Sequence, residues 1–439
     1  MRLIDKTLKL KIKLFGIEME FIDFLFAMVM LTFAFAARLY FYDIVSGDYA
    51  LSFADWMKEI QTAHANGQLY IGITPGVTDA STFDYNCMYQ YLMCFISLFH
   101  GLMSDMYLVK TASVVFDYVA AITVFRIIHY MSKDVKKAML AMSVTLMLPT
   151  VILNGAAWAQ NDIIYTTFIL LSFYWILRKR DLRAFIYFAI AYTFKQQAIF
   201  FLPFIIILWF KNRVKIRYIL TVPVIYFLSL VPAWAAGRNL SELLGRYGTQ
   251  AQMFSRLSSN FPNIYTVITS ELGSNISKEL IPCGMMITVL IFGAFVYYLY
   301  DKKFKFDGLI MLTLAAFTIE LLVFCLPCMH ERYAFIAEIF LFMYALYGVK
   351  RLAVAVGFEV LSMITYSRFL FGSTVKLLYP LAAINLCLIL YLAYDLYKQI
   401  KRSEKACLME KAQRDVIKPQ EDKEVEIQVS QDNQLKENV

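Results

Sequence analysis

The chain has 439 residues, of which 60% are hydrophobic and 17% are charged, and its mean hydropathy is +0.57. Soluble globular domains carry about 25% charged residues, so this composition excludes an ordinary soluble enzyme and indicates a polytopic membrane protein. The net charge of +8 does not predict nucleic-acid binding, because Lys and Arg lie mostly in short loops between apolar segments, where they set orientation.

Apolar stretches of span length recur along nearly the whole chain. Crossing roughly 30 Å of hydrocarbon takes about 20 helical residues. The candidates lie near residues 21–42, 86–103, 107–130, 138–153, 163–178, 183–195, 197–210, 216–235, 281–300, 308–326, 334–349, 352–371 and 376–397. We therefore expect an all-α transmembrane helical bundle of about 11–13 spans, forming one membrane domain over residues 1–400. Residues 401–439 are charged and poor in large apolar side chains, so we expect a disordered cytoplasmic tail there.

The basic loops orient these spans. If the basic N-terminus is cytoplasmic, the loop 43–84 lies outside. The later basic loops, which then lie inside, are at 178–183, 211–215, 301–305, 350–351 and 398–402. This orientation requires that segment 86–103 does not cross fully, because a crossing there would move every later loop to the other side. We favour a tilted or re-entrant 86–103, which puts the polar clusters described below at the outer face.

The first outer loop contains a candidate catalytic acid. Asp48 lies just after the first span, and the loop continues into an amphipathic segment over residues 53–65, in which apolar side chains recur at helical spacing. A carboxylate in this place suits a general base that takes a proton from an acceptor hydroxyl. The alternative is a solvated acid at the membrane interface.

Two further polar clusters lie at the ends of predicted spans. Trp158, Gln160 and Asp162 combine an aromatic ring with amide and carboxylate groups, the residue types that stack on sugars and bind hydroxyls. An aromatic belt residue followed by a helix N-cap is the alternative. Lys195, followed by two glutamines that include Gln197, suits a phosphate as a point charge, although a lysine that only snorkels to the interface fits as well.

The last cluster is His330, Glu331 and Arg332, which follows a predicted span. Arg332 offers a planar fork of donors to a phosphate oxygen, and His330 can donate to the same group or bind a metal. The sequence has no HExxH spacing, so we predict no protein-ligated metal site. No cofactor is firmly predicted, and a divalent cation is left open.

The predicted outer loop 236–280 carries a polar and aromatic patch. Its members are Arg246, Tyr247, Gln250, Gln252 and Arg256, followed by a turn at residues 260–263. Such a patch either closes over a substrate or is ordinary loop surface.

Five separated segments match the motifs of a known family in order. They are Gly47-Asp48-Tyr49 with Trp56, Asp84-Tyr85-Asn86, Asn154 to Asp162, Phe194 to Ala198 with Leu202-Pro203, and Leu326 to Tyr333. On these motifs the chain resembles the integral-membrane glycosyltransferases of the GT-C class, and within it the bacterial proteins related to GPI mannosyltransferase II. Two details depart from the family pattern: Ala159 stands where glycine is usual, and the second segment lacks its usual proline.

The resemblance implies a GT-C-type fold and a glycosyltransferase. It implies inverting transfer of a hexose, with mannose favoured, from a polyprenyl-phosphate-linked donor to an acceptor hydroxyl at the non-cytoplasmic face of the plasma membrane. Asp48 matches the first-loop acid and is the expected general base. The expected substrate-binding residues are Asp84, Tyr85, Trp158, Gln160, Asp162, Lys195, Gln197, His330, Glu331 and Arg332. The expected partners are the donor, a glycan or glycolipid acceptor and the lipid bilayer, with no nucleic acid.

The main alternative is a membrane transporter or a lipid flippase for a glycolipid. Charged residues inside the predicted spans motivate it, namely Arg38, Lys110, Asp117 and Glu320. Transporters often show internal repeats and broken helices at mid-membrane, whereas here the polar residues concentrate at one face and no repeat is visible. A non-catalytic scaffold whose outer loops bind a partner is a weaker alternative.

Overall fold

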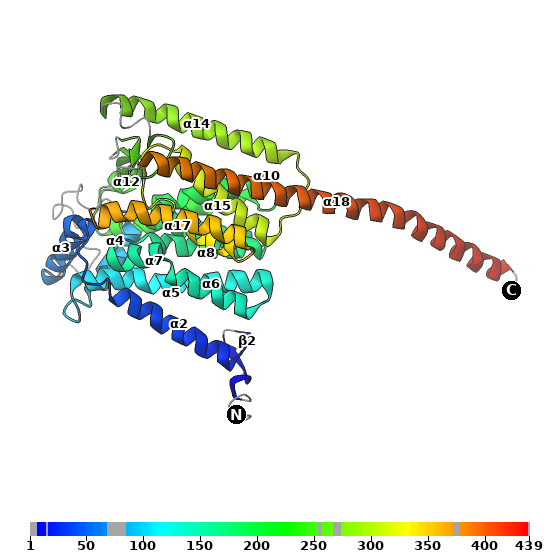
Figure 1. Cartoon of the computed structure of the whole chain (residues 1–439), viewed down its shortest axis with the longest axis horizontal. Coiled ribbons are helices and arrows are strands. Elements are labelled where there is room, and N and C mark those ends of the chain that lie inside the picture. The colour runs from blue at the N-terminus through cyan, green and yellow to red at the C-terminus, as the bar shows by residue number, and fades with distance from the viewer. Residues whose placement is uncertain are drawn as a thin grey trace.

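Helices form most of the part of the chain that the structure describes, because a backbone in hydrocarbon must satisfy its own hydrogen bonds. The computed structural model describes residues 7–14, 16–67, 85–252, 256–266, 274–372 and 378–437 (Figure 1). Within these residues, seven helices are long and apolar enough to cross a membrane. They are α2 (Phe21–Leu39), α5 (Asp105–Ser132), η4 and α11 (Ile216–Leu220 and Thr221–Ala235), α14 (Ser274–Tyr300), α15 (Gly308–Cys325), α17 (Val349–Leu370) and the first part of α18 (Leu378–Glu437).

Shorter helices fill the space between these spans. They are α6 (Val135–Met147), α7 (Pro149–Ile152), η2 (Leu153–Ala157), α8 (Asp162–Leu177), α9 (Asp181–Phe194), η3 (Gln196–Phe201), α10 (Leu202–Phe210) and α16 (Phe335–Ala345). α6 and the α7–η2 segment form a bent pair with an angle of 51°. Pro149 at the break explains the bend, since proline has no N–H for the preceding turn. The predicted all-α polytopic bundle is thus confirmed.

The few strands are short. β1 (Lys11–Leu14) pairs antiparallel with β2 (Ile17–Glu20), with Lys11 opposite Glu20. β3 (Ser258–Ser259) pairs in parallel with β4 (Met329–His330). The second pair matters for the site, because it joins the segment after α12 (Leu240–Gln252) to the segment after α15.

The segment 86–103 does not span the bundle. It forms α4 (Cys87–Ser97), whose 11 residues cover only about 16 Å at 1.5 Å per residue. The Asn86 side chain caps it by accepting from Cys87 N at 2.9 Å. Ser97 near its other end contacts His64 of α3 (Ala54–Ala65), and Gln61 of α3 donates to Asp105 at the start of α5 at 2.8 Å. The segment therefore starts and ends on the same side, as the orientation of the basic loops requires.

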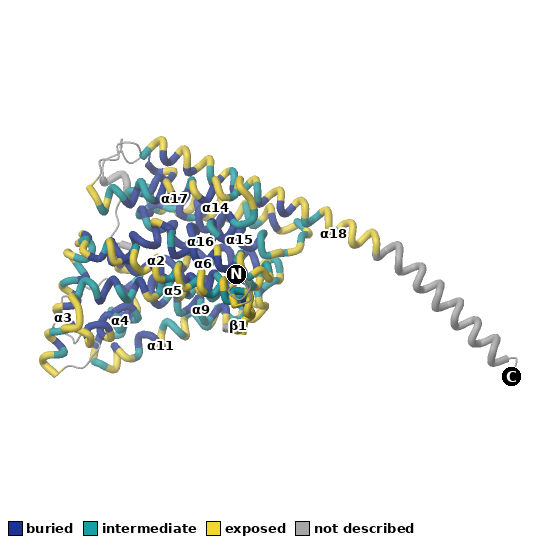
Figure 2. Tube along the Cα trace, turned by 60° about the horizontal axis from the view of Figure 1, so that its bottom comes forward, coloured by how far each residue is buried: buried dark blue, intermediate teal, exposed yellow. Residues whose placement is uncertain are grey.

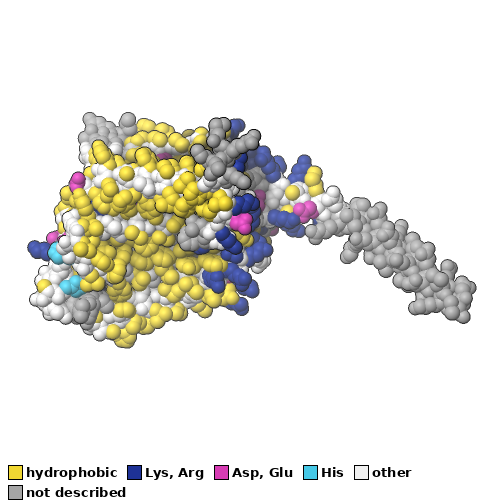
Figure 3. All heavy atoms as spheres, turned by 90° about the horizontal axis from the view of Figure 1, so that it is seen from below, with side chains coloured by type: hydrophobic (Ala, Val, Ile, Leu, Met, Phe, Trp, Pro, Cys, Tyr) yellow, Lys and Arg dark blue, Asp and Glu magenta, His cyan; other side chains and the backbone are white. Residues whose placement is uncertain are grey.

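The helices differ in how deeply they are buried. α15 is almost entirely enclosed, whereas α2, α11 and α14 expose most of their apolar side chains (Figure 2). Exposed apolar faces of this kind suit contact with lipid. Lys and Arg side chains gather at the end of the bundle from which α18 emerges (Figure 3), and α3, α4 and α12 lie at the opposite end (Figure 1).

α18 continues as one helix to Glu437 and leaves the bundle (Figure 1). Beyond residue 401 it contacts the loop between α14 and α15, where Lys303 N donates to Glu404 Oε1 at 3.2 Å. Lys305 N donates to Ser403 Oγ at 2.9 Å. That residues 401–439 form a separate disordered tail stays a prediction.

Charges inside the bundle fix the end of α2 against α5. Arg38 Nε lies 2.7 Å from Asp117 Oδ2, and both side chains are fully buried. Lys110 Nζ donates to the carbonyl oxygens of Tyr42 and Ile44, each at 2.7 Å. These charges therefore have a structural role: they hold the chain that leads from α2 into the first loop.

Removing one partner of the buried ion pair should destabilise the protein. Asp117→Asn leaves the Arg38 guanidinium without its counter-charge, which costs about 3–5 kcal/mol and should lower the Tm of the detergent-solubilised protein. The double variant Arg38→Met/Asp117→Leu should recover most of the loss, because both charges are gone. Val29→Ala on the exposed face of α2 is the control and should change little. A wild-type Tm for Asp117→Asn would contradict the structural role.

Candidate active site

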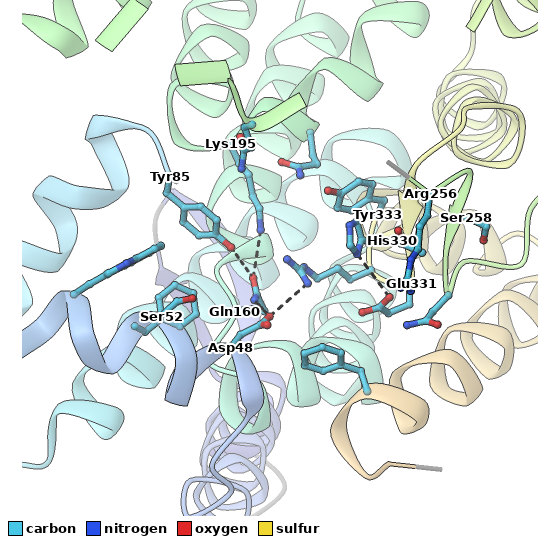
Figure 4. A pocket seen from close by; sticks show the side chains of 18 residues that line it. Asp48, Ser52, Tyr85, Gln160, Lys195, Arg256, Ser258, His330, Glu331 and Tyr333 are labelled. Atoms are coloured by element: carbon cyan, nitrogen blue, oxygen red, sulfur yellow. Dashed lines mark hydrogen bonds and ion pairs between the residues drawn. The ribbon is translucent and has the colours of Figure 1, made fainter. Parts of the chain in front are cut away.

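A cavity of about 470 Å³, seen from close by in Figure 4, is lined in part by Trp56 of α3 and Gln250 of α12. It therefore lies at the end of the bundle that carries these two helices (Figure 1). Segments that are far apart in the sequence form its wall. The lining residues are Asp48, Ser52, Phe53, Trp56, Tyr85, Gln160, Lys195, Gln197, Gln250, Arg256, Ser258, Ser259, Asn260, His330, Glu331, Arg332, Tyr333 and Phe369. All four polar clusters picked out in the sequence therefore meet at one site.

Most of the predicted site residues line this cavity. Those that do are Asp48, Tyr85, Gln160, Lys195, Gln197, His330, Glu331 and Arg332. Trp158 and Asp162 are buried behind the wall, where they contact residues of the lining. Asp84 lies outside the described residues.

Asp48 is held at the cavity by one of its two carboxylate oxygens. Oδ2 accepts from Trp158 Nε1 at 2.9 Å and from Gln160 Nε2, and it lies 3.6 Å from Arg332 NH1. Oδ1 accepts no hydrogen bond from the residues that the structure describes. The side chain is 28% exposed. Asp48 thus presents a free oxygen to the cavity while the other oxygen fixes its direction.

Trp158 is enclosed by other aromatic rings. Its ring stacks on Phe369 at a centroid distance of 4.6 Å and meets Tyr366 edge-on at 5.1 Å. The guanidinium of Arg332 lies 5.4 Å from the Trp158 ring centroid. Ser46 Oγ donates to the Trp158 carbonyl at 2.6 Å, which ties the first loop to this turn. The ring is therefore placed to direct the Asp48 carboxylate through its Nε1–H.

The turn after Trp158 has an unusual backbone. Ala159 has φ of +64°, in the left-handed region that favours glycine. Gln160 N donates to Asn154 O at 2.9 Å and closes the turn. This conformation explains why glycine is usual here in the proteins that the chain resembles, and alanine must bear a steric cost.

The Asp162 carboxylate anchors two cations. Its Oδ1 lies 2.6 Å from Lys195 Nζ, and its Oδ2 lies 3.4 Å from Arg332 Nε. Asn154 Nδ2 donates to the same Oδ2 at 2.8 Å. Asp162 is also the first residue of α8, where a negative charge interacts favourably with the helix dipole. Asp162 thus keeps both cations at the cavity wall without facing the cavity itself.

Lys195 lies in the break between α9 and η3. Its Nζ also donates to Asn161 Oδ1 at 3.0 Å and to Gln160 Oε1 at 3.4 Å. Burial lowers the pKa of the Lys195 ammonium to about 8, although Asp162 opposes the shift. The ammonium therefore carries its charge at neutral pH and releases the proton in mildly alkaline solution.

The segment between α15 and α16 supplies the opposite wall. Burial and the neighbouring Arg332 lower the pKa of His330 to about 3, so the imidazole is neutral at neutral pH. Burial raises the pKa of the Glu331 carboxyl. β4 holds this segment against β3, with Ser259 opposite His330. A neutral imidazole beside two cations suits a hydrogen-bond donor or acceptor rather than a third positive charge.

Some residues of the lining were not singled out in the sequence. Ser258 and Ser259 reach the cavity through the β3–β4 pairing, and Phe369 reaches it from the end of α17. Of the predicted patch in the loop 236–280, Gln250 and Arg256 line the cavity. Ser258 and Ser259 could not be predicted, because a two-residue strand is too short to show alternating apolar and polar residues. Phe369 could not be predicted either, because an aromatic residue at the end of a span resembles an ordinary residue of the aromatic belt.

In chemical terms the cavity combines a base with cations. Lys195, Arg256 and Arg332 supply positive charge, and Asp48 supplies a carboxylate with a free oxygen. In the part of the chain that is described, no three His, Cys, Asp or Glu side chains are grouped as metal ligands would be. The arrangement suits a substrate that carries an anionic group together with a hydroxyl that must lose a proton.

Glycine at position 159 should stabilise the protein. Ala159→Gly removes the steric cost of the left-handed backbone and should raise stability by about 1 kcal/mol, measured as a higher Tm in detergent. Ala157→Gly is the matched control: it lies in η2, its φ is not positive, and it should lower stability by about 1 kcal/mol. A lower Tm for Ala159→Gly would contradict the strained turn.

Comparison with known proteins gives one family. The model of glycosyltransferase family 87 matches residues 83–327, which is more than half of the chain and includes Tyr85, Gln160 and Lys195. No curated protein matches the chain significantly. The chain therefore belongs to glycosyltransferase family 87 and is a multi-pass membrane glycosyltransferase.

Proposed function

We propose that the protein transfers a hexose, with mannose favoured, from a polyprenyl-phosphate-linked donor to an acceptor hydroxyl. The reaction inverts the anomeric carbon and takes place at the non-cytoplasmic face of the plasma membrane. The acceptor is a glycan or a glycolipid. The observation that carries the proposal is the Asp48 carboxylate, which has one free oxygen and faces a cavity that also holds Lys195 and Arg332.

Asp48 acts as the general base. The acceptor hydroxyl donates to the free Oδ1, and its proton passes to Asp48 as the acceptor oxygen attacks the anomeric carbon. The bond between the anomeric carbon and the phosphate oxygen breaks, and its electron pair leaves with the polyprenyl phosphate. Trp158 and Gln160 hold the Asp48 carboxylate in its orientation during this step. Their role is to position the base, and they take no part in the proton transfer itself.

Lys195 and Arg332 stabilise the leaving phosphate. Both are held by Asp162 before substrate binds, so they need little reorganisation when negative charge develops. Arg332 is the better placed for direct contact, since its side chain is 14% exposed whereas that of Lys195 is 3% exposed. His330, neutral at neutral pH, can donate a further hydrogen bond without adding charge.

The remaining predicted residues divide into two roles. Tyr85, Gln197 and Glu331 line the cavity and are assigned to the sugar or the acceptor. Trp158 and Asp162 are buried, and we assign them to positioning Asp48 and the two cations instead of to direct sugar contact.

The distribution of charge supports the proposed side of the membrane. Lys and Arg gather at the end of the bundle opposite the cavity (Figure 3), and such residues mark the cytoplasmic side. The cavity then opens toward the outer face. Helices with exposed apolar faces, such as α11 and α14, leave room for the polyprenyl tail of the donor to lie in the bilayer beside the bundle.

Asp48→Asn should abolish transfer while donor binding persists. The amide cannot take the proton, so the rate should fall by about 10²–10⁴-fold. Transfer is measured in proteoliposomes as release of polyprenyl phosphate from a radiolabelled polyprenyl-phosphate hexose, with an extract of the cell-surface glycolipids as acceptor. Asp55→Asn, in the same loop and exposed, is the matched control and should stay active. Full activity in Asp48→Asn would remove this residue from the role of base.

Donor binding should weaken in alkaline solution. The Lys195 pKa of about 8 means that its positive charge is present below pH 8 and is lost above it, so the KM for the donor should rise about tenfold or more between pH 7 and 9.5. Lys195→Met lacks the titrating amine and should show a high KM that no longer changes over this range. An unchanged alkaline rise in Lys195→Met would show that another group is responsible.

A further inference from the structure

A second cavity lies at the end of the bundle opposite the active site. Its volume is about 770 Å³, within the range of roughly 300–1,000 Å³ that is usual for ligand sites. It lies between the C-terminal ends of α10 and α14 and the loops that follow them. Six basic residues line it, namely Lys179, Lys211, Arg213, Lys302, Lys303 and Lys305. The single acidic residue in the lining is Asp301.

Most of this positive charge is not neutralised within the described part of the chain. Lys305 forms an ion pair with Glu410 of α18. Lys211 Nζ donates to the carbonyl oxygens of Tyr300 and Lys302, at 3.0 and 2.7 Å, and so caps the end of α14. Arg213, Lys302 and Lys303 form no ion pair with a described carboxylate. The cavity therefore has an excess of positive charge that favours an anionic ligand.

Aromatic side chains hold the cations in place. Phe304 and Phe306 pack together with ring centroids 4.7 Å apart. The Lys211 ammonium lies 5.3 Å from the Phe304 ring, and the Arg213 guanidinium lies 5.7 Å from the Phe306 ring. These contacts restrict two long side chains, which lowers the entropy lost when they bind an anion.

The surroundings of the cavity mark the edge of the bilayer. Phe210 and Tyr300 in its wall are exposed, as is Trp209 beside them, and Trp and Tyr side chains collect at the headgroup level. α14 continues from Tyr300 into the bilayer with an exposed apolar face that includes Leu290. A ligand with an anionic head and apolar chains would contact both the basic cavity and the exposed apolar face of α14.

We propose that this cavity binds an anionic phospholipid. The phosphate lies among Arg213, Lys302 and Lys303, and the acyl chains extend along the exposed face of α14. Basic pockets between helix ends on the cytoplasmic side of membrane proteins bind such headgroups. A soluble phosphate would use the cations but leave the aromatic and apolar surface without a function. The site is separate from the active site and does not depend on the proposed reaction.

The test is native mass spectrometry of the full chain released from detergent with either phosphatidylglycerol or phosphatidylcholine. The wild type should retain phosphatidylglycerol in preference to phosphatidylcholine. The triple variant Arg213→Gln/Lys302→Gln/Lys303→Gln should bind phosphatidylglycerol about tenfold or more weakly, since it removes the three cations that are placed in the cavity to contact the phosphate. Lys11→Gln/Lys13→Gln/Lys136→Gln removes the same charge from exposed residues outside the cavity and should bind like the wild type.

Three results would overturn the proposal. They are wild-type affinity in the triple variant, an equal loss in the control variant, and displacement of the lipid by inorganic phosphate at an equal concentration, which would indicate a site for soluble phosphate. If the triple variant does not fold, Lys303→Gln replaces it, because this side chain is exposed and its loss should still weaken phosphatidylglycerol binding several-fold. Unchanged binding in Lys303→Gln would then count against the site.

Discussion

The site depends on the ion pairs that the buried Asp162 carboxylate forms with two cations. Two cations at a cavity wall inside a membrane bundle repel each other and are costly to desolvate, and Asp162 contacts both Lys195 and Arg332. Asn154 and the start of α8 stabilise the carboxylate in turn. Without this anion, Lys195 would lose its charged partner and Arg332 would keep only its contact with Asp48. The helical packing around α8 thus determines the charge of the cavity.

A second group of contacts gives the first loop its position. The ion pair of Arg38 with Asp117 and the hydrogen bonds from Lys110 to the carbonyl oxygens of Tyr42 and Ile44 fix the chain where it leaves α2. A few residues later, the Ser46 hydroxyl donates a hydrogen bond to the Trp158 carbonyl, and the Asp48 carboxylate accepts one from the Trp158 ring N–H. Charges that suggest a transport pathway in the sequence therefore serve to align an acid with the cavity. The same charged residues therefore contribute to the stability of the bundle and to the geometry of the site.

Much of the fold and part of the site could be predicted from the sequence, for physical reasons. Polar residues at span ends are costly unless they face a watery cavity, so their positions carry information, and the alternation of basic loops required segment 86–103 not to cross. The burial of Trp158 could not be predicted, because the ring that covers it comes from α17. Ser258 and Ser259 were missed because a two-residue strand has no detectable period. The charged groups of the site could therefore be predicted from the sequence, whereas the contacts that direct them could not.

The position of Arg332 between two carboxylates has a consequence for the timing of the proposed reaction. Its guanidinium lies 3.6 Å from Asp48 and 3.4 Å from Asp162. When Asp48 takes the acceptor proton, one of the two negative charges beside Arg332 disappears as a new one forms on the departing phosphate. The total negative charge around the guanidinium then stays constant through the step, so proton transfer and bond cleavage would be coupled through a single arginine that scarcely needs to move.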